Sequence, residues 1–251
     1  MKEQKPKILI WDIETSHTIV ATFSLWPKYI PHENILQDWS ILSVAWKWYG
    51  QDKIYCKYNR RDLLDDRDLV KHMIEVVSEA DLIIHHNGDK FDLPSLNTRA
   101  IKHKLGVIPP IKTLDTLKIA RKKFKFISNR LDYIGQYLGE GSKTPHSSGL
   151  WLQILQGDRK AIKEMAEYNK GDVVLLEKIY KRFIPYTDSI NHALFNKGCP
   201  KCGQAGKLER RGFVYTKTSK KQRYKCHKCG GWSKDGIGTD VGYETVAEIM
   251  R

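Results

Sequence analysis

The sequence lacks a long apolar run. No stretch of the 251 residues approaches the roughly 20 consecutive apolar residues that a membrane-spanning helix needs. The N-terminus, MKEQKPKILIWD, also lacks the apolar segment and the small-residue cleavage site of a signal peptide. Internal repeats and low-complexity tracts are absent as well. These absences predict a globular cytoplasmic protein that does not enter a membrane.

Acidic residues are scarce relative to basic ones. The chain has 43 Lys and Arg against 29 Asp and Glu, which gives a formal charge of +14. Residues 197–251 carry 13 basic and 5 acidic residues, so this last fifth alone has a net charge of +8. The excess predicts a polyanionic partner, because each neutralised phosphate releases condensed counterions. The alternative is a basic protein without such a partner.

Cysteine is also rare, with five residues in the chain. Four of them form two pairs with two intervening residues each, Cys199 with Cys202 and Cys226 with Cys229. Without a secretory signal, this spacing favours a metal site over disulfides. The pattern resembles a zinc ribbon, in which four thiolates hold one structural Zn²⁺. Cys56 stands alone and is predicted to be a buried or half-buried residue.

The hydrophobic pattern predicts an α/β domain with a mixed sheet flanked by helices. Strands are expected over 7–13, 41–49, 53–58 and 81–86. Helices are expected over 66–79, 94–104, 115–125, 130–138 and 159–184, with a mobile loop at 139–149. From Cys199 onward the apolar content falls. We therefore expect one domain over residues 1–190 and a small zinc-ribbon module over residues 197–251.

Three short motifs place acidic residues near the ends or on one face of these elements. Asp12 and Glu14 are two apart in the first strand, so both point to the same side. Asp92 follows the strand 81–86, at the sheet edge where α/β proteins commonly bind ligands. Tyr168 and Asp172 lie one turn apart on the last helix. Each motif also has a purely structural explanation: exposed acids, a helix cap, or a core tyrosine beside a solvated acid.

Taken in order, the segments ILIWDIET, HHNGDKFDLPSL and YNKGDVVLL resemble the three exonuclease motifs of DEDD exonucleases in the ribonuclease H-like superfamily. They are especially similar to the proofreading domain of family B DNA polymerases, and the tyrosine of the third motif resembles the DEDDy subgroup. The resemblance covers roughly residues 7–185. It implies that Asp12, Glu14, Asp92 and Asp172 bind metal and that Tyr168 orients the attacking water.

The same resemblance indicates supporting residues and cofactors. Asn87 and Phe91 match positions of the second motif and are expected to support the site or contact substrate. Asp115 resembles an aspartate that often follows this motif, but it can equally cap a helix. Two divalent ions about 3.5–4 Å apart would activate the water and stabilise the leaving oxygen. Carboxylate ligands suit Mg²⁺ or Mn²⁺.

Basic and aromatic residues alternate between the two cysteine pairs. Cations of this kind can contact phosphates while rings stack on unpaired bases. The alternatives are a structural ribbon with a solvated basic face and a module that docks a protein. His227 is expected to be exposed, because four cysteines complete the metal shell. The candidate substrate-binding residues are Arg210, Arg211, Phe213, Tyr215, Lys220, Lys221, Arg223 and Tyr224, and Lys217 and Lys225 share the pattern.

The expected function is hydrolysis of single-stranded nucleic acid from its 3′ end to nucleoside 5′-monophosphates. The polymerase resemblance favours DNA, although the motifs themselves do not separate DNA from RNA. One alternative is an RNA-trimming exonuclease of the same fold. Another is a non-catalytic nucleic-acid-binding or scaffold protein that keeps a relic site.

Overall fold

The computed structural model describes residues 6–59, 62, 65–188, 191–192, 198–206, 208–216, 219–236 and 239–240. The chain divides into two units, one spanning Pro6–Tyr180 and the other beginning at Lys181. The predicted boundaries of 1–190 and 197–251 remain a proposal. Among the described residues, no helix is both long and apolar enough to cross a membrane.

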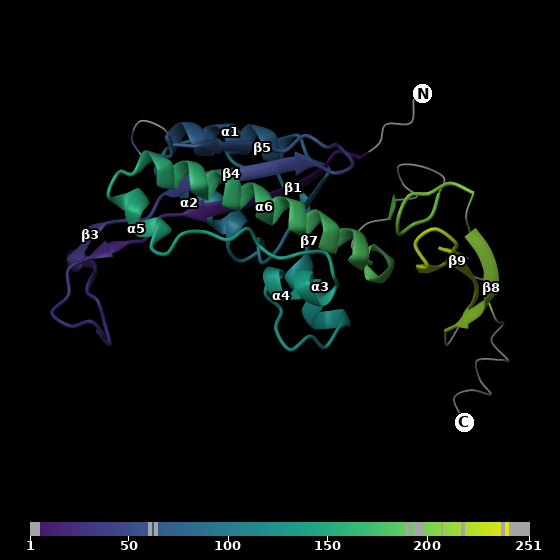
Figure 1. Ribbon diagram of the computed structural model, residues 1–251. Helices are drawn as coiled ribbons and strands as arrows, with labels where there is room; N and C mark the ends of the chain where they lie inside the picture. The colour runs from purple at the N-terminus through teal and green to yellow at the C-terminus, as the bar shows by residue number, and fades with distance from the viewer. Residues whose placement is uncertain are drawn as a thin grey trace. The chain divides into compact units, whose positions relative to one another are not determined.

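The first unit is built on a five-stranded mixed sheet, as predicted (Figure 1). The strands in spatial order are β5 (Tyr55–Tyr58), β4 (Ile41–Trp48), β1 (Ile8–Thr15), β6 (Leu82–His85) and β7 (Lys112–Asp115). The central strand β1 is antiparallel to β4 and parallel to β6. Outside them, β5 is antiparallel to β4 and β7 is parallel to β6. The sequence does not predict β7, because its four residues lie between the Pro109-Pro110 break and the helix expected from residue 115.

Helices cover both faces of this sheet, so the core has two parts. On one face, Leu9, Trp11 and Ile13 of β1 pack with buried residues of α1 (Arg67–Ser78) and α2 (Asp92–Lys102). On the other face, Leu42 of β4 packs with α5 (Leu150–Leu155) and α6 (Arg159–Phe183). The predicted inward stripe of α6 is buried: Ile162, Met165, Ala166, Val173, Leu176 and Ile179. The sheet is therefore the middle of three layers.

Two short helices follow β7, namely α3 (Thr116–Lys123) and α4 (Leu131–Tyr137). They agree with the helices predicted near 115–125 and 130–138. The segment 139–149 that follows contains no helix or strand, also as predicted. α5 was not predicted; it begins after Gly149, whose φ of 74° is a left-handed conformation that favours glycine.

Between β1 and β4 the chain forms a projecting hairpin. Its two short strands, β2 (Ile19–Val20) and β3 (Ile35–Gln37), pair antiparallel and enclose a 3₁₀ turn, η1 (His32–Asn34). We call residues 16–40 the arm.

The described part of the second unit contains a small antiparallel sheet. A 3₁₀ turn, η2 (Ile184–Tyr186), follows α6. Its strands are β8 (Leu208–Tyr215), β9 (Ser219–Cys226), β10 (Trp232–Lys234) and β11 (Thr239–Asp240). In this sheet, β9 pairs with β8, β10 and β11.

Candidate active site and metal centre

The acids of the first and third motifs meet between β1 and α6. Because Ile13 is in the core under α1 and α2, strand alternation directs Asp12 and Glu14 to the opposite face, which α6 covers. Asp172 of α6 is 1% exposed and lies on the same side. Carboxylate oxygens of Asp12, Glu14 and Asp172 lie within 4.8 Å of one another.

Asp92, the acid of the second motif, is the first residue of α2 and is buried. Its Oδ1 accepts a hydrogen bond from the backbone N–H of Ile13 at 3.1 Å. Ile13 is the residue between Asp12 and Glu14 in β1, so this bond holds Asp92 next to both acids. The charge of Asp92 raises the pKa of Asp12 and that of Glu14. Parallel pairing of β1 with β6 explains this, because α2 starts just beyond the end of β6.

Crowding and burial shift the protonation of the four carboxyl groups. Burial is the largest cause in each case, raising the pKa of Glu14 to about 8 and that of Asp92 to about 6. The pKa of Asp12 and that of Asp172 are also raised by burial. In Asp12, the neighbouring carboxylates add to the rise. Four acids in this arrangement are electrostatically unfavourable until cations compensate them.

Lys143 completes the cluster, although sequence reasoning missed it. Its Nζ donates hydrogen bonds to Asp172 Oδ2 at 2.5 Å and to Tyr168 Oη at 2.8 Å. Burial lowers the pKa of Lys143, but the charge of Asp172 and the two hydrogen bonds outweigh it, so the pKa is raised. Burial likewise raises the pKa of Tyr168, which keeps the phenol protonated at neutral pH. In the sequence, Lys143 is one basic residue in a loop and carries no distinguishing pattern.

Two contacts explain how this loop brings Lys143 to α6. The backbone N–H of Lys143 donates to Asp132 Oδ1 at 2.7 Å. Next in the chain, Thr144 lies against Gly171, where a β-carbon would come within 2.1 Å of Thr144 Oγ1. Gly171 therefore permits a close approach of the loop one residue before Asp172.

Asn169 is a second residue whose role was not predicted. It is completely buried, and its Nδ2 donates to Asp12 Oδ2 at 2.7 Å. Its Oδ1 accepts from Ser43 Oγ at 3.3 Å, which fixes the orientation of the amide. Asn169 lies inside the YNKGD motif, but no local pattern in the sequence indicates its contact with β1. It orients one oxygen of Asp12.

The residues present fit a divalent cation. Asp172 Oδ1 is buried and has no hydrogen-bond partner in the described structure. An ion among Asp12, Glu14, Asp92 and Asp172 would satisfy this oxygen and offset the repulsion that raises the pKa values. An all-oxygen ligand set suits Mg²⁺ or Mn²⁺ rather than zinc.

A cavity of about 1080 Å³ opens beside the acids and is lined in part by Lys143, Tyr168 and Asn87. Arg121 and Arg130 also line it, so its wall carries positive charge. Phe91, the other candidate contact from the second motif, is 43% exposed and is not part of this wall.

The loop that carries Asn87 is held by specific contacts. Asn87 has a φ of 68°, and its backbone N–H donates to Asp115 Oδ1 at 2.9 Å. The same oxygen accepts from the backbone N–H of Leu117, so Asp115 is the N-cap of α3. At Gly88 a β-carbon would come within 2.2 Å of the buried ring of His85. Of the two alternatives for Asp115, the helix cap is the one observed.

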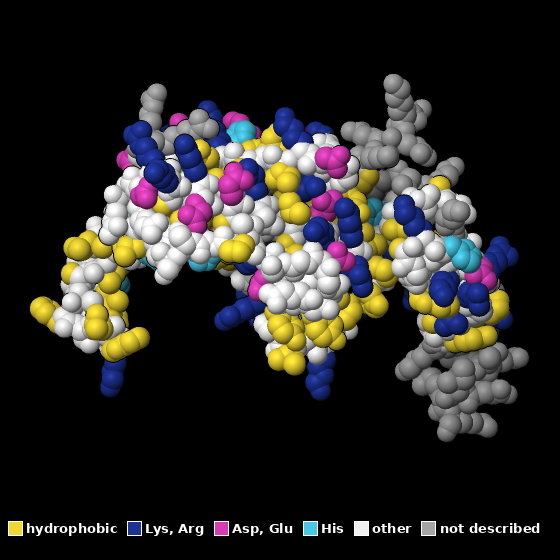
Figure 2. Space-filling model, in the orientation of Figure 1, with side chains coloured by type: hydrophobic (Ala, Val, Ile, Leu, Met, Phe, Trp, Pro, Cys, Tyr) yellow, Lys and Arg dark blue, Asp and Glu magenta, His cyan; other side chains and the backbone are white. Residues whose placement is uncertain are grey.

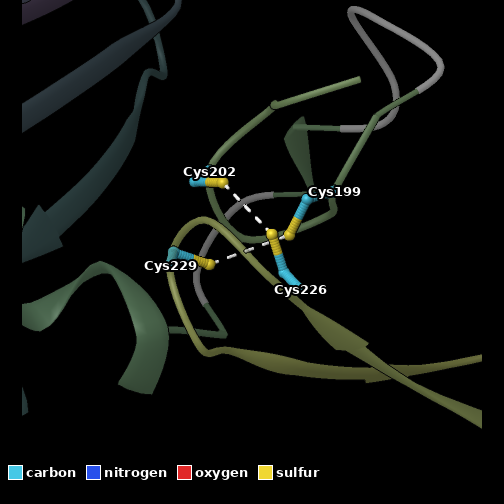
Figure 3. Close-up of side chains that lie close together, drawn as sticks. All are labelled: Cys199, Cys202, Cys226 and Cys229. Carbon is cyan, nitrogen blue, oxygen red and sulfur yellow. Dashed lines mark hydrogen bonds between the residues drawn. The ribbon is translucent and has the colours of Figure 1, made fainter. Parts of the chain in front are cut away.

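The four paired cysteines of the second unit form a second cluster (Figure 3). Their sulfur atoms all lie within 4.8 Å of one another, and Cys199–Cys229 and Cys202–Cys226 are each 3.9 Å apart. A tetrahedral zinc site with Zn–S distances of about 2.3 Å places its sulfurs about 3.8 Å apart. The cluster therefore has the dimensions to form a zinc ribbon.

Matching turns present the two cysteine pairs. The backbone N–H of Gly203 donates to the carbonyl of Cys199, and that of Gly230 donates to the carbonyl of Cys226. In each turn a further N–H lies 3.4 Å from a sulfur, Lys201 to Cys199 and Gly231 to Cys229. Such N–H groups stabilise thiolates.

The candidate nucleic-acid contacts of this unit lie on β8 and β9. Lys220 Nζ is 4.0 Å from the ring centroid of Phe213, and its strand partner is Tyr215. The guanidinium of Arg223 is 4.7 Å from the ring centroid of Trp232, a residue not predicted as a contact. Lys221 donates to the carbonyl of Gly236. Arg210 and Tyr224 are opposite each other in the register of β8 and β9, and Arg211 forms an ion pair with Glu209. His227 is exposed, as expected. Lys217 lies outside the described residues.

Comparison with known proteins assigns the first unit. The family model described as the RNase H superfamily matches residues 37–184, more than half of the chain. The chain belongs to the RNase H superfamily. In this RNase H superfamily protein, the matched range includes Asp92, Tyr168 and Asp172, while Asp12 and Glu14 precede it.

Two proteins illustrate the relationship. A DNA polymerase of Methanocaldococcus jannaschii is 27% identical over 176 residues, and the match covers 59% of this chain and 10% of the polymerase. The structure of the family B DNA polymerase from the hyperthermophilic archaeon Pyrobaculum calidifontis aligns with a TM-score of 0.52 and 15% identity. That alignment covers 85% of this chain and 31% of the polymerase. The chain thus spans about a tenth of the length of the Methanocaldococcus polymerase. The likeness to the Pyrobaculum structure concerns the fold alone.

Proposed function

We propose that this RNase H superfamily protein is a metal-dependent 3′→5′ exonuclease that hydrolyses single-stranded DNA to nucleoside 5′-monophosphates. The observation that carries the proposal is the convergence of Asp12, Glu14, Asp92 and Asp172 from three separate segments, with Tyr168 beside them. The likeness to DNA polymerases and the motif resemblance support the direction and the choice of DNA.

The four carboxylates would hold two Mg²⁺ or Mn²⁺ ions, which when bound activate a water and stabilise the leaving 3′ oxygen. Asn169 orients Asp12, and Ile13 orients Asp92, so two of the four ligands have fixed positions. Tyr168 stays protonated, accepts a hydrogen bond from Lys143 and hydrogen-bonds Asp172, so its hydroxyl is held beside the acids, where it would orient the attacking water. Lys143 adds a fixed positive charge that favours the phosphate.

The cavity beside the acids would receive the 3′-terminal nucleotides. Its lining combines Arg121 and Arg130 with the polar group of Asn87, which suits a phosphodiester chain. We further propose that residues 197–251 form a module that binds one structural Zn²⁺ through its four cysteines and contacts nucleic acid. Cysteines that bind a metal must stay reduced, which is consistent with a reducing compartment such as the cytoplasm.

The test is digestion of labelled 20-nucleotide strands with Mg²⁺ and after chelation. The proposal expects mononucleotides to be released, a 3′-blocked strand to resist, and a 5′-blocked strand to be degraded. Paired DNA and RNA strands of the same sequence decide between the deoxyribonuclease and the RNA-trimming alternative. Binding without Mg²⁺-dependent cleavage would instead indicate a nucleic-acid-binding protein with a relic site.

A further inference from the structure

The arm exposes an unusual concentration of large apolar side chains. Phe23 and Trp26 are 109% and 89% exposed, and Leu25 and Tyr29 are also exposed. Figure 2 shows hydrophobic side chains gathered on this projecting hairpin, away from the body of the first unit. Soluble proteins rarely leave a cluster of large apolar side chains exposed to water, so such a cluster indicates a binding site.

The base of the arm is firmly built. The backbone N–H of Ser16 donates to the carbonyl of Ser40 at 2.8 Å, and the N–H of Ser40 donates to Ser16 Oγ at 2.9 Å. Arg99, which is buried, donates to the carbonyl of Trp39 at 2.8 Å and lies over its ring. Asp66 binds both Arg99 and the backbone N–H of Ile41. The exposed tip is therefore carried on an anchored support.

The chemistry of the arm indicates its occupant. The acids of the arm are Glu33 and Asp38, both on the side that returns to β4. Residues 16–32 contain no acid, and within them Lys28 is close in sequence to the exposed rings. Aromatic rings and a cation on an acid-free segment suit unpaired bases on a phosphate backbone. The arm also begins one residue after β1, the strand that carries Asp12 and Glu14. We propose that the arm binds single-stranded nucleic acid by stacking its bases on Phe23, Trp26 and Tyr29.

This proposal rests on the proposed function, since it assigns the arm to the strand whose 3′ end enters the acid site. The arm would hold nucleotides of that strand outside the cavity. Short strands therefore should not need it, whereas longer strands should depend on it. Stacking requires bases, so a strand with the same phosphates but no bases should gain nothing from the arm.

The experiment compares the full chain with the triple variant Phe23→Ala, Trp26→Ala and Tyr29→Ala. A matched control, Ile101→Ala with Val107→Ala, removes equally exposed apolar groups from elsewhere on the first unit. Binding to a labelled 20-nucleotide oligodeoxythymidine is measured by fluorescence anisotropy with Ca²⁺ in place of Mg²⁺, and again with a 20-mer of abasic residues. Hydrolysis of a four-nucleotide strand with Mg²⁺ is followed in the same preparations.

The arm variant should bind the oligodeoxythymidine at least about tenfold more weakly, since one stacked base contributes roughly 5- to 140-fold. It should match the wild type on the abasic strand and in hydrolysis of the short strand, and the control variant should match it throughout. Equal affinity of the arm variant and the wild type for oligodeoxythymidine would overturn the proposal. In that case, analytical ultracentrifugation of both proteins would show whether the arm instead mediates self-association. Weakened binding in the arm variant, together with a wild type that hydrolyses no strand, would support the arm and overturn the proposed function alone.

Discussion

The two candidate metal sites of this chain contrast in what surrounds them. The carboxylate site lies between a sheet and a helix whose apolar cores are complete without a metal, with residues such as Trp11 and Met165 fully buried. In the described part of the second unit from residue 198 on, the only buried residues with side chains are Cys199 and Cys226. We therefore propose that a bound metal would serve chemistry in the first unit and folding in the second.

The largest expected effect concerns the cysteine cluster. Cys199→Ser with Cys226→Ser should abolish zinc binding and unfold the sheet of β8 to β11, because structural zinc contributes about 10–16 kcal/mol in small zinc modules. The first unit should keep its own thermal transition. Metal analysis and limited proteolysis measure both. Cys56→Ser is the matched control and should retain one zinc per chain; a folded ribbon in the double variant would contradict the comparison.

The next effect concerns the carboxylates. Asp12→Ala or Asp172→Ala should reduce hydrolysis by at least about 1000-fold, equivalent to roughly 4 kcal/mol of barrier. Asp12→Ala should not lower the thermal stability measured in EDTA, because it removes an acid that its neighbours repel. Asp172→Ala should lower it, because it also removes the ion-pair partner of Lys143. Asp52→Ala, on an exposed turn, should leave both properties unchanged. Turnover like the wild type in either site variant would remove these acids from the mechanism.

A smaller loss is expected from Gly171→Ala. The added β-carbon would displace Thr144 and with it Lys143, and misplacement of about 1 Å can cost roughly 100-fold in rate. Gly106→Ala is the control, because a β-carbon there meets nothing within 4 Å. Steady-state rates on a single-stranded 20-mer, with circular dichroism to verify folding, test this. Equal rates for the two variants would show that the loop does not need this close approach.

Protonation should affect the metal-free stability of the first unit. The folded pKa of Glu14 is about 8 and that of Asp92 about 6, both above their ordinary values of 4.5 and 3.8. The folded state then binds more protons than the unfolded state, so stability should fall as pH rises from about 4 to about 8. Melting temperatures in EDTA should drop by several degrees over this range, since 1 kcal/mol corresponds to about 2–4 °C. Added Mg²⁺ should reduce the drop, and an Mg²⁺-independent profile would contradict a metal among these acids.

The smallest effect concerns the basic surface of the second unit. Arg210→Ala with Lys220→Ala should make the salt dependence of single-strand binding shallower, by about 0.7 in the logarithmic slope per lost phosphate contact. Lys71→Ala, exposed on α1, should leave the slope unchanged. Titrations at several salt concentrations measure it. An unaltered slope in the double variant would favour a ribbon that docks a protein.

Local patterns in the sequence predicted most of the secondary structure of the first unit and part of both candidate metal sites. Alternation along β1 predicted that Asp12 and Glu14 share a side, and helical spacing predicted the buried stripe of α6. The spacing of the cysteines predicted their cluster. These features depend on residues close in the chain, or on motifs whose order is informative, so a linear reading is enough. The roles of the acids and the domain boundaries stay predictions.

Only the tertiary structure decided the contacts between distant segments. Lys143 reaches Asp172 across 29 positions, and Asn169 reaches Asp12 across 157. Neither pairing has a local pattern, because each depends on which surfaces the sheet and the long helix bring together. The exposed rings of the arm also could not be predicted from the sequence. Phe23 and Trp26 are residue types typical of a protein core, and only the tertiary structure shows that no other described part of the first unit covers them. A side chain's burial depends on packing with the rest of the chain, and that packing is what the tertiary structure determines.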